Sequence, residues 1–177
     1  MDNSIKEKTM RETEKDDVAQ FAKIIKDIKF AMLTTREVGG NTLASRPMTM
    51  QQMEFDGDLW FFASWSSELV NQIENNPYVN LAFSNPKDFS FLSAQGVAEV
   101  TTDEEKAKQL WNPMYKAWFP EGLDDPSLCL FKVKIENADY WQSPDSAIVR
   151  LVGFAKAILT GQKANSALGK HGHLEIN

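Results

Sequence analysis

The stretch NTLASRPMTMQQMEFDGDLWFFASWSS, residues 41–67, predicts two β-strands, at 42–54 and 59–64, joined by a turn at Asp56-Gly57. Asp-Gly is a preferred turn dipeptide, and the aromatic residues after it favour extended structure. The first strand carries Arg46 directly before Pro47, and the second is followed by a run of hydroxyl side chains. Because proline has no N–H to donate to a sheet ladder, we expect the first strand to be unpaired or bulged at Pro47.

Further strands and helices are predicted on both sides of this stretch. Short β-prone runs bounded by turn residues predict strands at 29–35, 78–84, 89–102, 127–141 and 147–159. Apolar residues at three- and four-residue spacing, together with capping patterns, predict helices from residue 13 to about residue 28, and at 67–76, 103–111 and 113–119. Six or seven strands joined mostly by short turns favour a closed or nearly closed antiparallel barrel with helices on its outside.

The chain is expected to form one domain. The sequence predicts a polar N-terminal tail at residues 1–12 and a C-terminal tail at residues 163–177. The domain, with its N-terminal helix, is predicted between them at residues 13–162. The N-terminus has no apolar leader-like segment, and no apolar run approaches the ~18 residues of a membrane span. We therefore expect a cytoplasmic protein without membrane contact.

The composition narrows the possible partners and the redox chemistry. Hydrophobic residues make up 42% of the 177 residues, which is enough for a core, and the net charge is −6 with a pI near 5.0. This acidic balance argues against a nucleic acid or an anionic membrane surface as the main partner. The single cysteine, Cys129, excludes an internal disulfide, and its strand-like surroundings predict a buried, inert thiol.

Common catalytic motifs are missing from the sequence. It contains no phosphate-binding P-loop, no G-x-G-x-x-G turn, no H-E-x-x-H and no C-x-x-C. The two histidines, His171 and His173, would share one face of a strand, but a polar tail is the favoured interpretation and no metal site is predicted. A Ser–His–Asp hydrolase is disfavoured because no histidine lies in the body of the predicted fold.

Arg46 and the serines Ser64, Ser66 and Ser67 are the remaining candidates for a binding site. An arginine beside free backbone groups can bind a flat heterocycle and an anion. Hydroxyl donors at a helix start, together with the free N–H groups of its first turn, suit a phosphate. Two simpler alternatives stay open at this point, an ordinary exposed arginine and serines that only cap the helix.

The order of several segments resembles a known family. The segments are FAMLTT, ASRPM, DGDLWFFAS, VNQIENNPYVNLAFSNP and SAQGVAEV, followed by LWNPMYKAWFPEGLDDPSLCLFKVKIENADYW. Over roughly residues 15–162 they resemble the pyridoxamine 5′-phosphate oxidase-like split-barrel flavoproteins, and more narrowly the general stress protein 26 group. The N-P-x-V-N-L strand and the W-F-P-x-G-x-D-D-P loop are the most specific parts of the match.

The resemblance implies a mainly β fold, a six-stranded antiparallel split β-barrel with flanking helices. It also implies a homodimer with flavin mononucleotide (FMN), rather than FAD or F420, in clefts between the protomers. The site residues it implies fall into three groups. Arg46, Pro47 and Met48 would lie along the ring and ribityl chain, Phe62, Ala63 and Ser64 would border them, and Ser66 and Ser67 would hold the phosphate.

Leu69 departs from the family pattern. The family carries S-x-K where this chain has Ser67-Glu68-Leu69, so a leucine replaces a cation and Glu68 adds a negative charge. Losing one charge-assisted contact would weaken flavin binding by about 1.5–3 kcal/mol.

Two functions from different classes follow from the resemblance and this departure. One is an FMN-dependent oxidoreductase of the general stress type, and the other is a non-catalytic stress protein that binds or sequesters flavin. A dimeric interaction module without ligand is a third possibility. Pyridoxamine-phosphate oxidation is disfavoured, because the chain lacks a substrate-phosphate cluster and a long basic C-terminal segment, and no catalytic residue is predicted.

Overall fold

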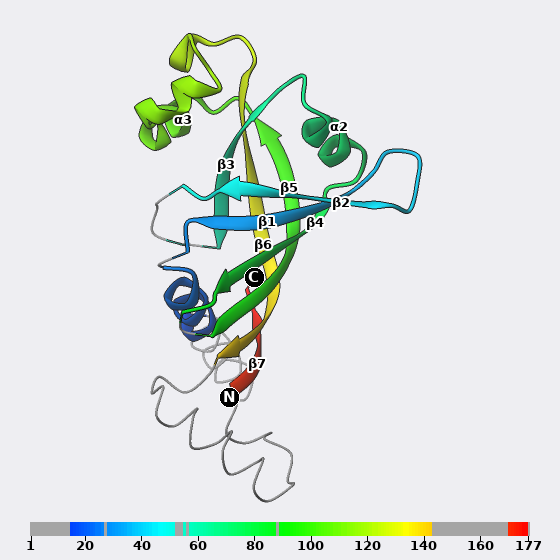
Figure 1. Cartoon of the computed structure of the whole chain (residues 1–177), viewed down its shortest axis with the longest axis vertical. Helices are drawn as coiled ribbons and strands as arrows, with labels where there is room; N and C mark the ends of the chain where they lie inside the picture. The colour runs from blue at the N-terminus through cyan, green and yellow to red at the C-terminus, as the bar shows by residue number, and fades with distance from the viewer. Residues whose placement is uncertain are drawn as a thin grey trace, which may run out of the picture.

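The computed structural model describes residues 15–26, 28–51, 55, 57–87, 89–142 and 170–176. Its strands are β1 (Phe30–Arg36), β2 (Leu43–Thr49), β3 (Asp58–Ser64), β4 (Tyr78–Asn85), β5 (Ser90–Thr101), β6 (Leu128–Gln142) and β7 (Lys170–Glu175). They form one antiparallel sheet in the order β2-β1-β4-β5-β6-β3, with β7 also paired to β6 (Figure 1). The mainly β, antiparallel architecture predicted from the sequence is confirmed.

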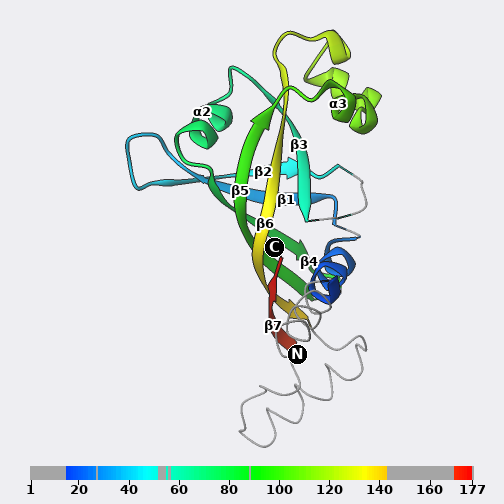
Figure 2. The same cartoon turned by 180° about the vertical axis from the view of Figure 1, so that it is seen from behind.

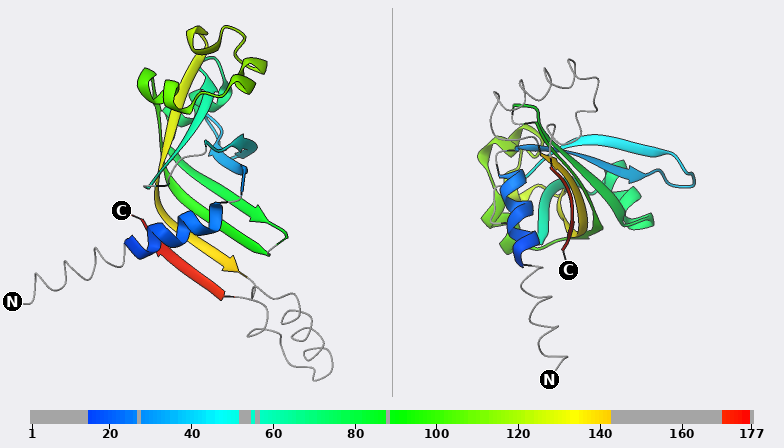
Figure 3. Two further views of the ribbon diagram at one scale, coloured as in Figure 1. Left: turned by 90° about the vertical axis from the view of Figure 1, so that its left-hand side faces the viewer. Right: turned by 90° about the horizontal axis from the view of Figure 1, so that it is seen from below.

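Short helices pack against this sheet. They are α2 (Glu68–Asn75), α3 (Glu104–Leu110) and the 3₁₀ helices η1 (Pro113–Ala117) and η2 (Gly122–Asp124), and residues 15–25 are also helical. α2 and the α3–η1–η2 insert lie toward one end of the molecule, and the helix at 15–25 lies against the other half of the sheet (Figure 3). In the described part of the chain, no helix combines the length and apolar character that a membrane crossing requires.

The barrel is open between β2 and β3, although only a short connection separates these two strands in the sequence. β2 pairs with β1 alone and β3 with β6 alone among the described strands, so each ends one side of the sheet. The sheet curls, and β1 and β2 cross in front of β5 and β6 in Figure 1 and behind them in Figure 2. The two strands of the opening stretch therefore both present a free edge at the split.

Pro47 lies in a regular part of β2, which corrects the expected bulge. The register runs without a shift from Phe30↔Thr49 through Met32↔Pro47 to Arg36↔Leu43. The proline is tolerated because β2 is an edge strand, where a missing N–H leaves no ladder partner unpaired. The irregular register lies instead between Gln95 and Gly96 in β5.

The C-terminal tail predicted for residues 163–177 is wrong for residues 170–175, which form β7. This strand adds a seventh member to the six-stranded barrel, and it pairs with β6 from Asn137↔Glu175 to Gln142↔Lys170. Leu174 and Ile176 are buried, so a short period-2 alternation was the missed signal. The strand predicted at 147–159 lies outside the described residues.

Two apolar clusters hold the sheet and its helices together. The main core fills the barrel and includes Phe131 stacked on Phe61 at 5.0 Å between ring centroids. A second cluster joins β3 and β6 to the α3–η1–η2 insert through Phe62, Leu110, Phe119 and Leu130. The insert is therefore packed on the outside of the barrel and is fixed to β3.

Cys129 is buried in the main core, as predicted. Burial, with a smaller contribution from Glu74, raises the pKa of Cys129 from 9.0 to about 11. Its Sγ lies 3.4 Å from the carbonyl oxygen of Ala63.

We expect Cys129 to react slowly with thiol reagents in the folded protein. A pKa two units higher leaves about 100-fold less thiolate at pH 8, and burial slows attack further. The rate of reaction with an aromatic disulfide should therefore be at least about 100-fold lower in buffer than in concentrated urea. Similar rates in the two conditions would contradict this placement of the thiol.

Candidate functional site

A hydrogen bond joins the side chain of Arg46 on β2 to Gln72 on α2. Its side chain is on the inward face of β2, and its Nη2 donates to Gln72 Oε1 at 2.7 Å. Its other terminal nitrogen, Nη1, is buried and finds no hydrogen-bond partner among the described residues. A buried charged donor without an acceptor is costly, so this N–H marks a place where an acceptor would be favourable.

Gln72 organises the polar contacts around Arg46. It is fully buried on the inward face of α2, and its Oε1 also accepts from Thr35 Oγ1 at 2.5 Å. Its Nε2 donates to Glu68 Oε1 at 3.2 Å, one turn earlier in the helix. The carbonyl oxygen thus faces two donors and the amide nitrogen faces a carboxylate, which fixes both the amide and the guanidinium that it holds.

The three serines lie at the start of α2, where β3 ends. Ser67 is the N-cap, and its hydroxyl accepts from the backbone N–H of Val70 at 3.3 Å. Ser64 Oγ and Ser66 Oγ are 3.1 Å apart on the exposed side of this corner. Capping therefore describes Ser67, while Ser64 and Ser66 form a hydroxyl pair that solvent or a ligand can reach.

The other predicted site residues have different surroundings. Pro47 is exposed on the face of β2 opposite to Arg46, and Met48 is half-buried against the main core. Ala63 is buried in the main core, and Phe62 packs against Trp111 and Tyr115 at ring-centroid distances of 5.7 and 5.0 Å. Arg46 and the serines therefore lie next to α2. The side chains of Phe62 and Ala63 instead pack into the two apolar clusters.

Leu69 lies in the main core and is only 6% exposed. The resemblance placed Leu69 beside a phosphate, where the family has a lysine. In the structure the Leu69 side chain is buried and does not reach the surface. A leucine suits the site for a physical reason, since the first inward position of α2 is surrounded by apolar groups. A lysine here would have to bury its stem and turn its ammonium group out at the end of the helix.

The sequence patterns did not point to Gln72, Thr35 or Glu68. Gln72 stands three residues after Leu69 and next to Ile73, so it occupies an inward position of an amphipathic helix. A polar residue at such a position was the available signal, because a buried amide needs hydrogen-bond partners. The identity of those partners was not readable, since Arg46 and Thr35 are distant in sequence.

Replacing Gln72 with leucine is expected to lower the free energy of unfolding by about 2–4 kcal/mol. Leucine has a side-chain volume similar to that of glutamine. The change therefore mainly removes the acceptor that the Thr35 hydroxyl and the Arg46 guanidinium share. Urea denaturation would measure the loss, with Asn71→Ala on the exposed face of α2 as the control. Equal midpoints for Gln72→Leu and wild type would show that the network adds no stability.

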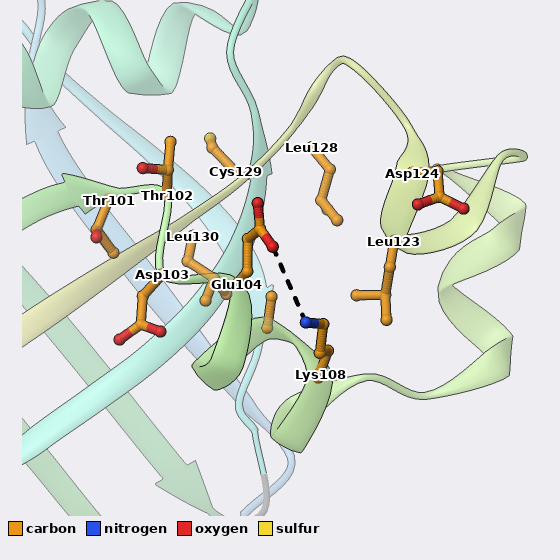
Figure 4. A pocket seen from close by; sticks show the side chains of 11 residues that line it. Thr101, Thr102, Asp103, Glu104, Lys108, Leu123, Asp124, Leu128, Cys129 and Leu130 are labelled. Carbon is orange, nitrogen blue, oxygen red and sulfur yellow. Dashed lines mark ion pairs between the residues drawn. The ribbon is translucent and has the colours of Figure 1, made fainter.

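A separate pocket of about 380 Å³ lies between the end of β5, α3, η2 and the start of β6 (Figure 4). Its lining includes Asp103, Glu104 and Asp124, and it holds Lys108, whose Nζ is 3.9 Å from Glu104 Oε2. A hydrogen bond to Glu105 raises the pKa of Lys108 above its usual value. None of the predicted site residues lines this pocket.

Both histidines lie on β7, far along the sheet from Arg46. His173 Nδ1 is 2.9 Å from Asp139 Oδ1, and His171 Nε2 is 4.0 Å from the same oxygen. Within the described ranges, no group of three or more His, Cys, Asp or Glu side chains has the arrangement to hold a metal ion.

The curled antiparallel sheet, open between β2 and β3 and covered by short helices, defines a split β-barrel protein. The model of the family described as pyridoxamine 5′-phosphate oxidase like matches residues 16–165. Because this match covers most of the chain, the protein belongs to that family.

Several known proteins are similar to this chain. Protein bli-3 of Neurospora crassa is 29% identical over 145 residues, which cover 77% of this chain and 69% of bli-3. A Xanthomonas citri crystal structure, described as a general stress FMN/FAD binding protein, is 31% identical with a TM-score of 0.64 and covers 75% of this chain and 92% of its own. A candidate general stress protein 26 from Jannaschia sp. CCS1 has a TM-score of 0.72 at 23% identity, covers 91% and 99% respectively, and supports the fold alone.

Proposed function

We propose that this chain binds FMN and acts as a flavin-dependent oxidoreductase of the general stress type. The observation that carries the proposal is Nη1 of Arg46, a buried cationic donor on edge strand β2 that has no acceptor among the residues that the structure describes. The similarity to the Xanthomonas citri protein described as FMN/FAD binding supports the same ligand class. FMN is favoured over FAD and F420 because the site offers one arginine and one hydroxyl pair, which suit a single phosphate.

The residues around the start of α2 fit a phosphate. Arg46 would provide a charge-assisted hydrogen bond, and the Ser64 and Ser66 hydroxyls would donate from the exposed side. The first backbone N–H groups of α2 add a favourable dipole. Glu68 would oppose the anion, but Gln72 Nε2 binds its carboxylate, which offsets part of that negative charge.

The remaining predicted contacts come from β2 and the end of β3. Pro47 and Met48 would lie along the ring and ribityl chain, and the backbone at Phe62 and Ala63 would border them. When bound, the flavin would supply hydride or two-electron transfer at its N5. Two copies of the chain would associate, with the flavin sites at the boundary between them.

A non-catalytic flavin-binding protein is the second candidate, and the position of the proton-transfer groups favours it. His171 and His173 lie on β7, next to Asp139 of β6, and Cys129 is a buried thiol. In the described part of the chain, the histidines and the thiol therefore lie away from Arg46. Flavin could be held here without an acid–base group to assist turnover.

Titration with FMN, FAD and F420 tests the proposed function. Quenching of flavin fluorescence at micromolar FMN supports the site, and stopped-flow addition of NADH or NADPH then separates the two candidates. Flavin reduction by either nucleotide supports the oxidoreductase, whereas tight binding without reduction supports the sequestering protein. If none of the three cofactors binds at micromolar concentration, both candidates fail.

A further inference from the structure

Thr35 and Gln72 are the two buried polar side chains among the described residues, and they are bonded to each other. The Gln72 oxygen that accepts from Thr35 also accepts from Arg46. If this pair served packing alone, two apolar side chains of the same shape would do so without a desolvation cost. We propose that Gln72 is a positioning residue, which holds the Arg46 guanidinium in place and makes the site prefer a phosphorylated ligand over the same ligand without its phosphate. This inference rests on the proposed function.

The strand that carries Arg46 does not by itself fix the arginine side chain. β2 pairs with β1 alone among the described strands, and the residue opposite Arg46 is Leu33, an apolar member of the main core. Within the described residues, the side-chain hydrogen bond of Arg46 is the one from Nη2 to Gln72 Oε1, at 2.7 Å. If this bond did not order the long side chain, ligand binding would have to overcome the lost side-chain freedom, and affinity would fall.

Gln72 can hold the guanidinium because its own amide is fixed at both ends. Its Oε1 accepts from Thr35 and Arg46, and its Nε2 donates to Glu68 Oε1 at 3.2 Å. An amide turned the other way would set its NH₂ group against two donors and its oxygen against a carboxylate. One favourable orientation therefore remains, with the amide oxygen toward Arg46.

The arrangement favours an anionic group on the ligand. With Nη2 of Arg46 bonded to Gln72, the buried donor that remains is Nη1. A phosphate offers this donor an anionic acceptor, and a charge-assisted hydrogen bond is about twice as strong as a neutral one. The hydroxyl and carbonyl oxygens of an unphosphorylated flavin do not offer a charged acceptor. The contact to Nη1 therefore contributes most to the affinity of the phosphorylated form.

An uncharged acceptor at position 72 matters for the same reason. The Gln72 amide orients the guanidinium without neutralising it, so the positive charge of Arg46 stays available to a ligand. A carboxylate at this position would form an ion pair with Arg46 and compete with the phosphate. It would also place a second negative charge beside Glu68, which already lies next to the Gln72 amide. The inference therefore predicts that glutamate cannot replace glutamine here, although the two side chains have nearly the same size.

Fluorescence titrations with FMN and riboflavin test the inference, because the two ligands differ only in the phosphate. Gln72→Leu should lower the ratio of FMN affinity to riboflavin affinity by about 10-fold, with the riboflavin affinity unchanged. Gln72→Glu should lower this ratio at least as far, since it neutralises Arg46. Asn71→Ala, on the exposed face of α2, is the control and should keep the wild-type ratio. A wild-type protein that binds FMN and riboflavin equally well overturns the inference.

A double variant separates positioning from simple support of the fold. In the Arg46→Ala background, Gln72→Leu should leave the FMN affinity unchanged, because no guanidinium is left to position. A role in the fold alone would instead weaken FMN and riboflavin binding equally, with or without Arg46. Circular dichroism shows which variants are folded. Folded Gln72→Leu and Gln72→Glu proteins with the wild-type ratio overturn the inference, as does an equal effect of Gln72→Leu in both backgrounds.

The guanidinium can also be observed without a ligand, which keeps the inference and the proposed function separate. In nitrogen NMR spectra a held guanidinium gives separate Nη signals, whereas a freely rotating one gives a single averaged signal. Wild type should show separate signals for Arg46, identified by their loss in Arg46→Ala, and Gln72→Leu should not. An averaged Arg46 signal in wild type overturns the inference, whether or not flavin binds. If wild type shows separate signals but binds neither flavin, the proposed function fails and the positioning of Arg46 by Gln72 stands.

Discussion

Replacing Arg46 with alanine is expected to weaken FMN binding by about 10- to 150-fold. The change removes a charge-assisted hydrogen bond, worth about 1.5–3 kcal/mol, from a buried donor. Fluorescence titration would give the affinity, and titration with riboflavin, which lacks the phosphate, would locate the contact. Riboflavin affinity should stay unchanged if Arg46 binds the phosphate.

Two further variants control for charge and for folding. Arg46→Lys keeps the positive charge but loses the planar fork, so its FMN affinity should lie between those of wild type and Arg46→Ala. Arg36→Ala, on the neighbouring strand but facing outward, should leave the affinity unchanged. Equal FMN affinity for folded Arg46→Ala and wild type would place the cofactor elsewhere.

Replacing Phe131 with alanine is expected to lower the free energy of unfolding by about 3–5 kcal/mol. Phe131 is fully buried, stacks on Phe61 and lies on β6, which pairs with β3, β5 and β7. Truncation loses the transfer free energy of the ring and leaves a cavity in the centre of the barrel. The loss is a large part of the roughly 5–15 kcal/mol that stabilises a typical domain.

Urea denaturation at one fixed protein concentration would measure this effect, because the proposed association of two copies would make stability depend on concentration. Trp118→Ala removes a larger ring that is 69% exposed on the insert and should change stability by less than about 1 kcal/mol. A similar loss in both variants would show that the insert, rather than the barrel core, limits stability.

Local pattern was sufficient for most of the strands and helices. The β-prone runs 29–35 and 78–84 and the capped amphipathic stretch 67–76 correspond to β1, β4 and α2, because strand propensity and helix capping are short-range properties. β7 was not predicted because its buried side is marked only by Leu174 and by Ile176 just after the strand ends, next to the small Gly172. A strand with so few apolar residues is defined by its partner β6 more than by its own sequence.

The candidate site was only partly predictable from the sequence. Arg46 and the serines stood out because their residue types suit an anion, and the structure places them around one helix. The role of Gln72 and the burial of Leu69 depend on which face of α2 meets the barrel. Such a choice follows from packing between distant segments, and no short window of sequence contains it.

The sequence by itself determined that residues 41–67 make two strands and a capped helix start, and that Arg46 precedes a proline. Only the tertiary structure decided that β2 and β3 are the two edges of the split, so that Pro47 needs no bulge. The physical reason is that strand propensity is local, whereas the neighbours of a strand depend on how the whole sheet curls and closes. Nη1 of Arg46 is buried on edge strand β2, and this donor is the basis of the proposed function.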